Sequence, residues 1–431
     1  MLNINKKSRL LLGEPMTSLC DENLSVKLFK PQRKSLETSF ISNSVEELVS
    51  FNSKSKNWYR LMPFAYWAWL GIDIIEVMSV ISNISSSTNK RTREGVFDTV
   101  YEYGSGNWCY EFSQKATEYV AKAQEASENN DSDNAFKYYR FAYLFFAIAS
   151  YPHLKGDELG EQALIQHYIY YKKAVDFLPG YFEELKIDVE GKTVSAYLHT
   201  PNKSEVLPCV VIYSNYHNLS TEYLRYYREY LFPRNIAMLS VDLPAVGLSR
   251  AFDLQPDIGF IHNAVIEHVI NNCLYINRNK IGLLSQRFGS IAAVHSLIKF
   301  NKNVKCACFI GPILHEFFVN KEALERTPSM FRASISNRIG FDTNMWHIVS
   351  SQLQVYSVQK RGLLTNLDLD NPILIIGDKN DLLSTSKDIQ VAQKISDEHK
   401  IKYLDSKMSG LEKFKNVIEM ISEFFEKQFY D

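Results

Sequence analysis

The chain has 431 residues, of which 45% are hydrophobic and 13% aromatic, enough to bury a large core and to form two or three structural units. Its 48 basic and 49 acidic residues nearly cancel, so no overall field favours nucleic acid or an anionic membrane, and a small or neutral partner is expected. The six cysteines are scattered, with no C-x-x-C pair and no histidine cluster at ligand spacing. That pattern indicates neither a zinc site nor a disulfide framework.

The first part of the chain predicts an N-terminal arm. Residues 1–43 mix charged residues with proline and serine and show no sustained period. The apolar stretch Leu10–Leu12 is too short for a secretory signal, so we expect a cytoplasmic protein. Met16 competes with Met1 as the native start.

Residues 44–178 predict a helical cap domain. Aromatic and aliphatic residues recur at spacings of three and four in Ala135–Ala149, which is typical of a helix. Tyr151 precedes a proline and should end that helix, because a residue before proline disfavours the α region. The most hydrophobic window, Leu61–Ile81, contains two carboxylates and predicts a core helix rather than a membrane span.

Residues 179–431 predict an α/β domain with a mostly parallel sheet. Two strands that pair antiparallel come first, and continuous apolar runs then alternate with helical stretches, as expected for strands buried on both faces. The predicted strands are Phe182–Val189, Thr193–His199, Cys209–Tyr213, Ile236–Val241, Lys280–Leu284, Cys306–Ile310, Pro372–Ile376 and Ile401–Leu404. The predicted helices are Thr221–Leu231, Asp257–Ile270, Phe288–Phe300, Thr385–Lys400 and Lys413–Gln428. Residues 315–366 are too long for a simple crossover and predict a helical insertion over the sheet.

The segment Ile281–Ser290 has the layout of a nucleophile elbow, in which an apolar strand, a tight turn and a helix follow one another. In the G-x-S-x-G form of this motif, small residues flank a serine held at the start of the helix. Here Arg287 stands at the nucleophile position and Gly289 closes the turn. Ser285 stands at the first glycine position and would end the strand, so we do not assign it as the nucleophile.

An arginine at a helix N-terminus is unfavourable by about 0.3 to 1 kcal/mol against the helix dipole, which predicts an anion beside Arg287. The best internal candidate is Asp242, which directly follows the strand Ile236–Val241 and so reaches the same edge of the sheet. Two interpretations stay open: a buried ion pair that joins two loops, or a ligand-binding or catalytic site.

These residues also carry a resemblance to the FrsA family of bacterial esterase-like proteins. That family has a G-F-R-F-G elbow and a D-x-P-x-V-G loop, which appear here as S-Q-R-F-G and as Asp242–Gly247. Similar stretches follow in order along most of the chain, at Leu28–Pro31, Asn57–Arg60, Gly106–Trp108, Tyr151–Asp157, Ile310–His315 and Gly362–Leu364.

The resemblance implies an α/β-hydrolase with a helical cap, a cytoplasmic location, activity on small carboxylic esters and no metal or organic cofactor. It also implies Arg287 and Asp242 as the positions of a polar site. Cofactor-free decarboxylation of a small 2-oxo acid and a partnership with the glucose-specific carrier protein of the sugar phosphotransferase system are further implications of the family.

The chain departs from the family and from ordinary hydrolases at the oxyanion site. Ser285 replaces the family's glycine, and the loop after Cys209–Tyr213 lacks the glycines that bring backbone N–H groups to an oxyanion. We therefore expect Asn215 or His217 to supply side-chain donors.

A Ser-His-Asp triad in the usual chain order is absent. Asp381 occupies a plausible acid position, with Asp378 as a rival, but no histidine follows His399. His262 and His315, near the predicted sheet edge and lid, are further candidates for substrate binding. The remaining histidines of the helices, such as His153, His167 and His295, are interpreted as structural.

Three functions therefore compete. The first is an esterase-like or decarboxylase-like enzyme for a small carboxylate or carboxylic ester, in which Arg287 binds the carboxylate or oxyanion and Asp242 orients it or exchanges a proton. The second is a catalytically inactive hydrolase fold that binds a metabolite or a regulatory protein. The third, cleavage of a larger natural product, ranks last because such folds normally keep serine at the elbow.

Overall fold

The computed structural model describes residues 37–39, 48–49, 57–365, 367–405 and 407–431. Most of the predicted arm, the candidate start at Met16 and the stretch Leu28–Pro31 lie outside these residues. None of the helices within the described ranges is both long enough and apolar enough to span a bilayer.

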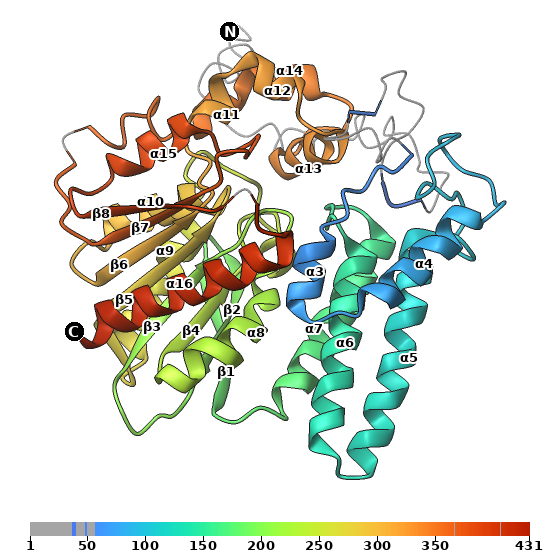
Figure 1. Cartoon of the computed structure of the whole chain (residues 1–431), viewed down its shortest axis with the longest axis horizontal. Coiled ribbons are helices and arrows are strands. Elements are labelled where there is room, and N and C mark those ends of the chain that lie inside the picture. The colour runs from blue at the N-terminus through green and yellow to red at the C-terminus, as the bar shows by residue number, and fades with distance from the viewer. Residues whose placement is uncertain (1–36, 40–47, 50–56, 366, 406) are drawn as a thin grey trace, which may run out of the picture.

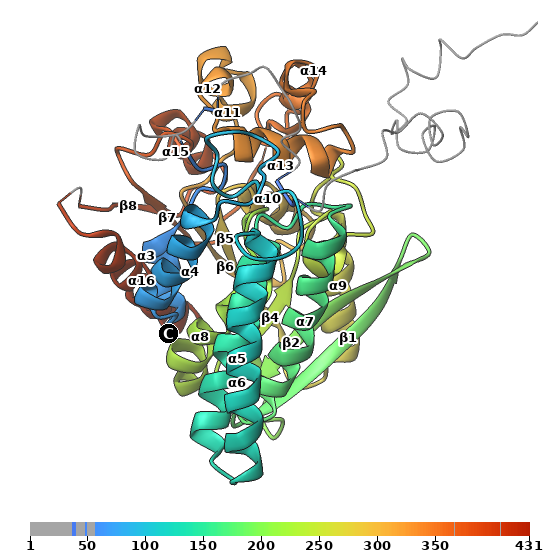
Figure 2. The same cartoon turned by 90° about the vertical axis from the view of Figure 1, so that its right-hand side faces the viewer.

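The helices before the sheet form a layer beside it, which we call the cap (Figures 1 and 2). They are α3 (Phe64–Leu70), α4 (Ile74–Ser86), α5 (Trp108–Glu128), α6 (Ser132–Ser150) and α7 (Glu158–Val175). Helix α6 packs between α5 and α7, and its C-terminal half is buried on every side because residues 142–150 are nearly all apolar. The side chain of Asp131 caps its N-terminus. The helix ends before Tyr151, as the sequence predicted.

The strands of the described chain form one eight-stranded sheet in the order β1-β2-β4-β3-β5-β6-β7-β8. They are β1 (Tyr181–Val189), β2 (Lys192–Thr200), β3 (Leu207–Tyr213), β4 (Ala237–Val241), β5 (Ile276–Gln286), β6 (Val304–Ile310), β7 (Ile373–Gly377) and β8 (His399–Tyr403). The pairings β1-β2 and β2-β4 are antiparallel, and all later neighbours are parallel. The predicted α/β-hydrolase fold class is therefore confirmed.

Helices cover both faces of the sheet (Figure 1). Helix α16 (Gly410–Tyr430) and the segment around α8 (Leu224–Tyr226) lie in front, and α9 (Phe260–Asn272) and α10 (Gly289–Lys299) lie behind. Strands β3, β4 and β7 are consequently buried along their whole length, which explains their continuous apolar runs.

The insertion between β6 and β7 lies above the carboxyl ends of the strands (Figure 1), and we call its helices the lid. They are α11 (Glu316–Val319), α12 (Lys321–Glu325), α13 (Ser329–Ile339), α14 (Trp346–Gln352) and the 3₁₀ turn η6 (Leu353–Tyr356). The buried guanidinium of Arg338 on α13 donates to the carbonyl oxygens of Pro152 in the cap at 2.9 Å and of Tyr216 beside β3 at 2.8 Å. One lid residue thus joins the cap, the lid and the sheet.

Two predicted helices were partly wrong. The stretch predicted as one helix over Thr221–Leu231 is divided into the 3₁₀ turn η2 (Ser220–Tyr223), α8 and the π-helical turn η3 (Tyr227–Leu231). The predicted helix Thr385–Lys400 stops at Gln393, where α15 (Ser386–Gln393) ends. Its last residues instead lead into β8, an edge strand whose exposed residues give no buried apolar pattern to detect.

The first helix of the cap lies beside the last helix of the chain. Helices α3 and α16 pack together, and the rings of Tyr66 and Phe414 are 5.6 Å apart between centroids. Gly410 permits this approach, since a Cβ atom there would stand 2.8 Å from the Cβ of Ala65. The two helices form one wall of the cavity described below.

Candidate active site

The elbow between β5 and α10 holds its central residue in a left-handed conformation. Arg287 has φ +54°, which is uncommon for any residue other than glycine and is typical of strained positions at functional sites. Its backbone N–H donates to the carbonyl of Ile310 at 3.0 Å. A Cβ atom at Gly289 would lie 2.5 Å from the carbonyl oxygens of Tyr213 and Ser214, so only glycine permits this approach. The segment has the strand-turn-helix geometry of a nucleophile elbow, with Arg287 in the place of the nucleophile.

The serine next to the elbow is not available for catalysis. Ser285 is fully buried, and its hydroxyl donates to the carbonyl of Cys308 at 3.1 Å within the sheet. This placement agrees with the prediction that Ser285 lies at the end of the strand and is not the nucleophile.

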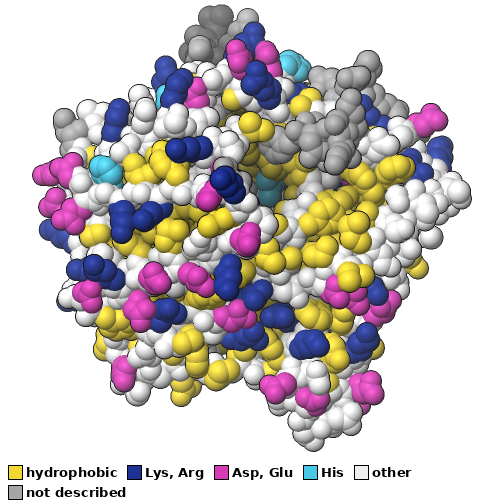
Figure 3. Space-filling view, in the orientation of Figure 1, with side chains coloured by type: hydrophobic (Ala, Val, Ile, Leu, Met, Phe, Trp, Pro, Cys, Tyr) yellow, Lys and Arg dark blue, Asp and Glu magenta, His cyan; other side chains and the backbone are white. Residues whose placement is uncertain are grey.

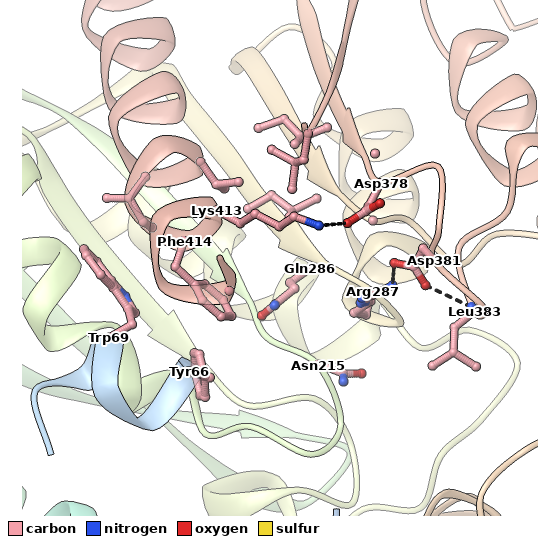
Figure 4. A pocket seen from close by; sticks show the side chains of 18 of the residues that line it. Tyr66, Trp69, Asn215, Gln286, Arg287, Asp378, Asp381, Leu383, Lys413 and Phe414 are labelled. Atoms are coloured by element: carbon pink, nitrogen blue, oxygen red, sulfur yellow. Dashed lines mark hydrogen bonds and ion pairs between the residues drawn. The ribbon is translucent and has the colours of Figure 1, made fainter. Parts of the chain in front are cut away.

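Arg287 forms an ion pair with Asp381, which lies in the loop after β7 (Figure 4). The second carboxylate oxygen of Asp381 accepts hydrogen bonds from the backbone N–H groups of Leu383 at 2.9 Å and Ser384 at 3.1 Å. These hydrogen bonds hold the carboxylate of Asp381 in place, and the carboxylate in turn holds one Nη atom of the Arg287 guanidinium. The other guanidinium donors bond to no residue in the described part of the chain, and the side chain keeps 31% of its surface exposed.

The expected pairing of Arg287 with Asp242 was wrong. Asp242 is fully buried and accepts hydrogen bonds from Ser220 N at 2.7 Å, Leu248 N at 2.9 Å and the hydroxyl of Tyr168 at 2.9 Å. Burial raises the pKa of its carboxyl, and these hydrogen bonds oppose the rise. The loop after β4 turns the carboxylate toward α7 of the cap, so Asp242 joins the cap to the sheet and does not line the cavity beside Arg287.

A cavity of about 490 Å³ opens beside Arg287 at the carboxyl ends of the strands. Ligands of parallel α/β sheets bind at this edge. In the space-filling view, hydrophobic side chains gather around a hollow on this face, with charged side chains close by (Figure 3).

The cavity has a charged end and an apolar end (Figure 4). At the charged end, the pair Arg287–Asp381 lies near a second ion pair, Lys413 Nζ to Asp378 Oδ2 at 2.6 Å. The hydrogen bond from Lys413 lowers the pKa of the Asp378 carboxyl. The other end is formed by apolar side chains of α3, the segment around α8 and α16, namely Trp69, Leu70, Tyr226, Phe414, Val417 and Ile418.

Two amide side chains border the charged end. Asn215 follows β3 and its Oδ1 accepts from the N–H of Tyr216 at 2.9 Å, which leaves its NH₂ group without a partner among the described residues. Gln286 accepts from the hydroxyl of Tyr223 at 3.0 Å through its Oε1, so its NH₂ group is likewise free of described partners. Both residues line the cavity and can donate hydrogen bonds to a ligand.

The structure places a further carboxylate on the cavity wall that the sequence did not reveal. Glu222 in η2 is 8% exposed and accepts hydrogen bonds from the hydroxyl of Tyr66 at 2.6 Å and the amide of Asn218 at 3.0 Å. Burial raises the pKa of its carboxyl to about 7. No motif or spacing marks this glutamate in the sequence, because Tyr66, its partner in the cap, is far away along the chain.

The three histidines predicted to bind substrate do not line this cavity. His217 is buried with its ring 4.3 Å from that of Phe331, and burial lowers its pKa. His262 on α9 stacks on Tyr213, the last residue of β3, and burial lowers the pKa of His262 to about 4. His315 lies in the lid, where its Nδ1 and the hydroxyl of Ser357 are 2.8 Å apart.

Histidine is absent from the cavity lining formed by the described residues. His399, which follows Asp381 in the chain, begins β8 and thus lies at the opposite end of the sheet. No group of three or more His, Cys, Asp or Glu side chains in the described ranges is placed to hold a metal ion. Of the predicted residues, Arg287, Asp381 and Asn215 meet at one cavity.

The strand order, the elbow and the cavity at the carboxyl ends define the chain as an α/β-hydrolase with a cap. The family described as Esterase FrsA-like matches residues 19–430, and the chain belongs to this family. Esterase FrsA of Photobacterium profundum is 31% identical over 388 residues, which cover 88% of this chain and 92% of the relative. Esterase FrsA of Yersinia pestis is 30% identical over 417 residues, which cover 95% of this chain and 99% of the relative.

Solved structures share the fold at low sequence identity. The 2,6-dihydroxy-pseudo-oxynicotine hydrolase aligns with a TM-score of 0.68 and 15% identity, over 85% of this chain and 96% of its own. AbyA5 aligns with a TM-score of 0.59 and 13% identity, over 83% of this chain and 99% of its own. Both similarities include the cap as well as the sheet, since the coverage exceeds the length of the sheet domain.

Proposed function

We propose that this chain hydrolyses a small carboxylic ester in the cavity at the carboxyl ends of the strands, without a Ser-His-Asp triad. The observation that carries the proposal is the position of Arg287, whose free donors lie at the charged end of a cavity in an esterase-family fold. Its guanidinium would hold the carbonyl oxygen of the ester, or a carboxylate of the substrate, in place of the usual backbone donors.

The electrostatic arrangement supports binding of an oxyanion. Asp381 occupies one side of the Arg287 guanidinium, and a guanidinium has five N–H donors in all. The amide groups of Asn215 and Gln286 border the same end of the cavity. Donors held in place before the reaction stabilise charge that develops on a carbonyl oxygen, typically by a factor of about 10² to 10³ for each donor.

The size and lining of the cavity support a small, partly apolar substrate. Its volume of about 490 Å³ falls in the range of small-molecule sites. Aromatic and aliphatic side chains opposite the charged end would hold the acyl or alcohol group. We therefore expect short or aromatic esters to bind better than charged, extended ones.

The test is hydrolysis of a panel of short acyl and aryl esters by the purified chain and by Arg287→Ala. We expect kcat/KM to fall about 100-fold in the variant, as for loss of an oxyanion donor. Arg234→Ala is the matched control, because Arg234 pairs with Glu426 at similar exposure and lies outside the cavity. Equal turnover by wild type and Arg287→Ala would exclude this role for the guanidinium.

A second candidate function is binding without turnover, of a metabolite or of a regulatory protein of sugar metabolism. It is favoured by the occupation of the nucleophile position by an arginine that already has an internal acid, Asp381. Here a panel of small carboxylates, 2-oxo acids and ester analogues should raise the melting temperature with no product formed. A ligand at 100 times its dissociation constant adds about 2.7 kcal/mol to the free energy of unfolding, and Arg287→Ala should remove this gain.

A further inference from the structure

Glu222 is a carboxylate at the junction of the cap and the sheet. It lies in η2, directly after the loop that follows β3, and lines the same cavity as Arg287. The hydroxyl of Tyr66 reaches it from α3 of the cap, and the amide of Asn218 reaches it from the loop. Both groups donate to the same carboxylate atom, Oε2.

The second carboxylate oxygen, Oε1, accepts no hydrogen bond from a side chain in the described ranges. The backbone of Leu219 also stabilises the ionised carboxylate, but no lysine or arginine among the described residues pairs with Glu222. The other acids of the cavity differ, because Asp381 and Asp378 are each paired with a cation. Among the described acids that line the cavity, Glu222 is therefore the one that is buried and has no cationic partner, so it can accept a proton.

We propose that Glu222 is the general base of the ester hydrolysis, taking a proton from a water molecule in the cavity while Arg287 holds the substrate's carbonyl oxygen. This step rests on the proposed function. Tyr66 and Asn218 fix the carboxylate through Oε2, and in the proposed step Oε1 would accept the proton of the water. A carboxyl group with a pKa of about 7 is well matched to this work, since a general base is most effective when its pKa lies near the working pH.

Glu222 alone takes up the proton of the water and later returns it, so the reaction needs no other acid or base. As an O–H bond of the water breaks, its proton moves to the carboxylate and its oxygen forms a bond to the carbonyl carbon. The tetrahedral intermediate then reforms the carbonyl and breaks the bond to the alcohol oxygen, which receives the proton from Glu222. One ester and one water give one carboxylic acid and one alcohol, and no atom of the protein is bonded covalently to the substrate.

The tyrosines and histidines around Glu222 should stay uncharged across neutral pH, so the titration of Glu222 should dominate the pH profile. Burial raises the pKa values of the surrounding tyrosines above their ordinary range and lowers those of the two nearby histidines. Asp242 also interacts with Glu222; burial raises the pKa of the Asp242 carboxyl, and its three hydrogen-bond donors oppose the rise. The groups that face Glu222 from the cap, the loop and η2 are Tyr66, Tyr143, Tyr151, His153, His217, Tyr223 and Asp242.

The experiment is the pH dependence of kcat/KM for the best ester found with the wild type, compared with Glu222→Gln. For the wild type we expect a tenfold rise per pH unit that levels off near pH 7, since only the ionised carboxylate accepts a proton. Glu222→Gln should lose about 100-fold or more in kcat and lose the inflection, with KM changed little. Glu229→Gln is the matched control, because Glu229 lies seven residues further along the same segment, is paired with arginines and lies outside the cavity.

Two more variants separate a chemical role from a structural one. Tyr66→Phe removes a donor that favours the ionised carboxylate, so its inflection should move to higher pH. Glu222→Asp keeps a carboxylate and should keep an inflection at reduced kcat, which preserves the test if Glu222→Gln does not fold.

The outcomes are distinct. If Glu222→Gln keeps the wild-type rate and inflection, Glu222 is not the base, although the esterase proposal stands. If the wild type hydrolyses no ester at any pH, the proposed function fails and the role of Glu222 fails with it.

Discussion

Two aspartates follow parallel strands at the same edge of the sheet, yet their surroundings give them different roles. Asp242 after β4 is fully buried, and two backbone N–H groups and Tyr168 occupy its oxygens. Asp381 after β7 borders the cavity and holds Arg287. Residue type and position after a strand therefore do not decide the role of an acid. The direction in which its loop turns, and the donors found there, decide it.

The largest expected effect is on stability, when the buried acid Asp242 is removed. Asp242→Ala leaves three buried donors without their acceptor, so we expect the free energy of unfolding to fall by about 4 kcal/mol. Urea denaturation measures this loss. The control Asp176→Asn, at an exposed position after α7, should change it by less than about 0.5 kcal/mol.

The loss of Asp242 should affect stability much more than activity. Because its carboxylate does not reach the cavity, the folded fraction of Asp242→Ala should retain turnover close to that of the wild type. A variant that stays fully folded and loses turnover would contradict the contrast between the two aspartates.

Glu222 combines features of the two acids, since it is buried like Asp242 and lines the cavity like Asp381. Its pKa is raised from 4.5 to about 7 on folding, so the folded state binds more protons than the unfolded state between these values. Stability from this group is thus present at low pH and is lost as the pH rises from about 4.5 to 7. The full loss is about 3 kcal/mol for a shift of this size.

Glu222→Gln tests that sign through chemical denaturation between pH 5 and pH 8. The variant should lose less stability than the wild type over this range, because the amide does not ionise. A wild-type chain that becomes more stable relative to the variant as the pH rises would contradict the raised pKa.

A smaller effect on stability should distinguish the backbone conformation of the elbow from the role of the Arg287 side chain. Arg287 has φ +54°, a conformation that is unfavourable for residues with a Cβ atom by about 1 kcal/mol. Arg287→Gly should therefore be about 1 kcal/mol more stable than Arg287→Ala, while the two variants should show the same reduction of any ester turnover. Thermal denaturation of the two variants side by side measures the difference, and equal stabilities would mean that the elbow relaxes when the guanidinium is removed.

The smallest effect belongs to the second ion pair of the cavity. Lys413 and Asp378 each keep about one fifth of their side-chain surface exposed, at 22% and 21%. Lys413→Ala should thus change the free energy of unfolding by less than about 1 kcal/mol, as is usual for partly exposed pairs. A loss of stability comparable to that of Asp242→Ala would show that burial does not determine how much each of these acids contributes to the free energy of unfolding.

The sequence predicted the sheet well where burial leaves a pattern. Strands β3, β4 and β7 are continuous apolar runs because both of their faces are covered. Strand β8 has no such pattern, since it forms the edge and is mostly exposed. The same reason made the end of α15 hard to predict.

The candidate site could be predicted only where strand ends fix it. Arg287 and Asp381 follow β5 and β7, so parallel strands bring them to one edge, and both were candidates from the sequence. The partner of Arg287 was misassigned because Asp242 satisfies the same rule. Glu222 and Tyr66 were missed because their meeting depends on how the cap docks, and no local pattern records that docking.

The neighbouring positions of α3 and α16 have a consequence for how the chain becomes functional during synthesis. These helices wall one cavity, but α3 leaves the ribosome before any strand of the sheet and α16 leaves after all of them. The apolar wall of the cavity therefore cannot be complete until the end of the chain has been made. The wall is completed only after the last helix has been synthesised, and a product that ends before α16 would lack both this wall and the cover of one face of the sheet.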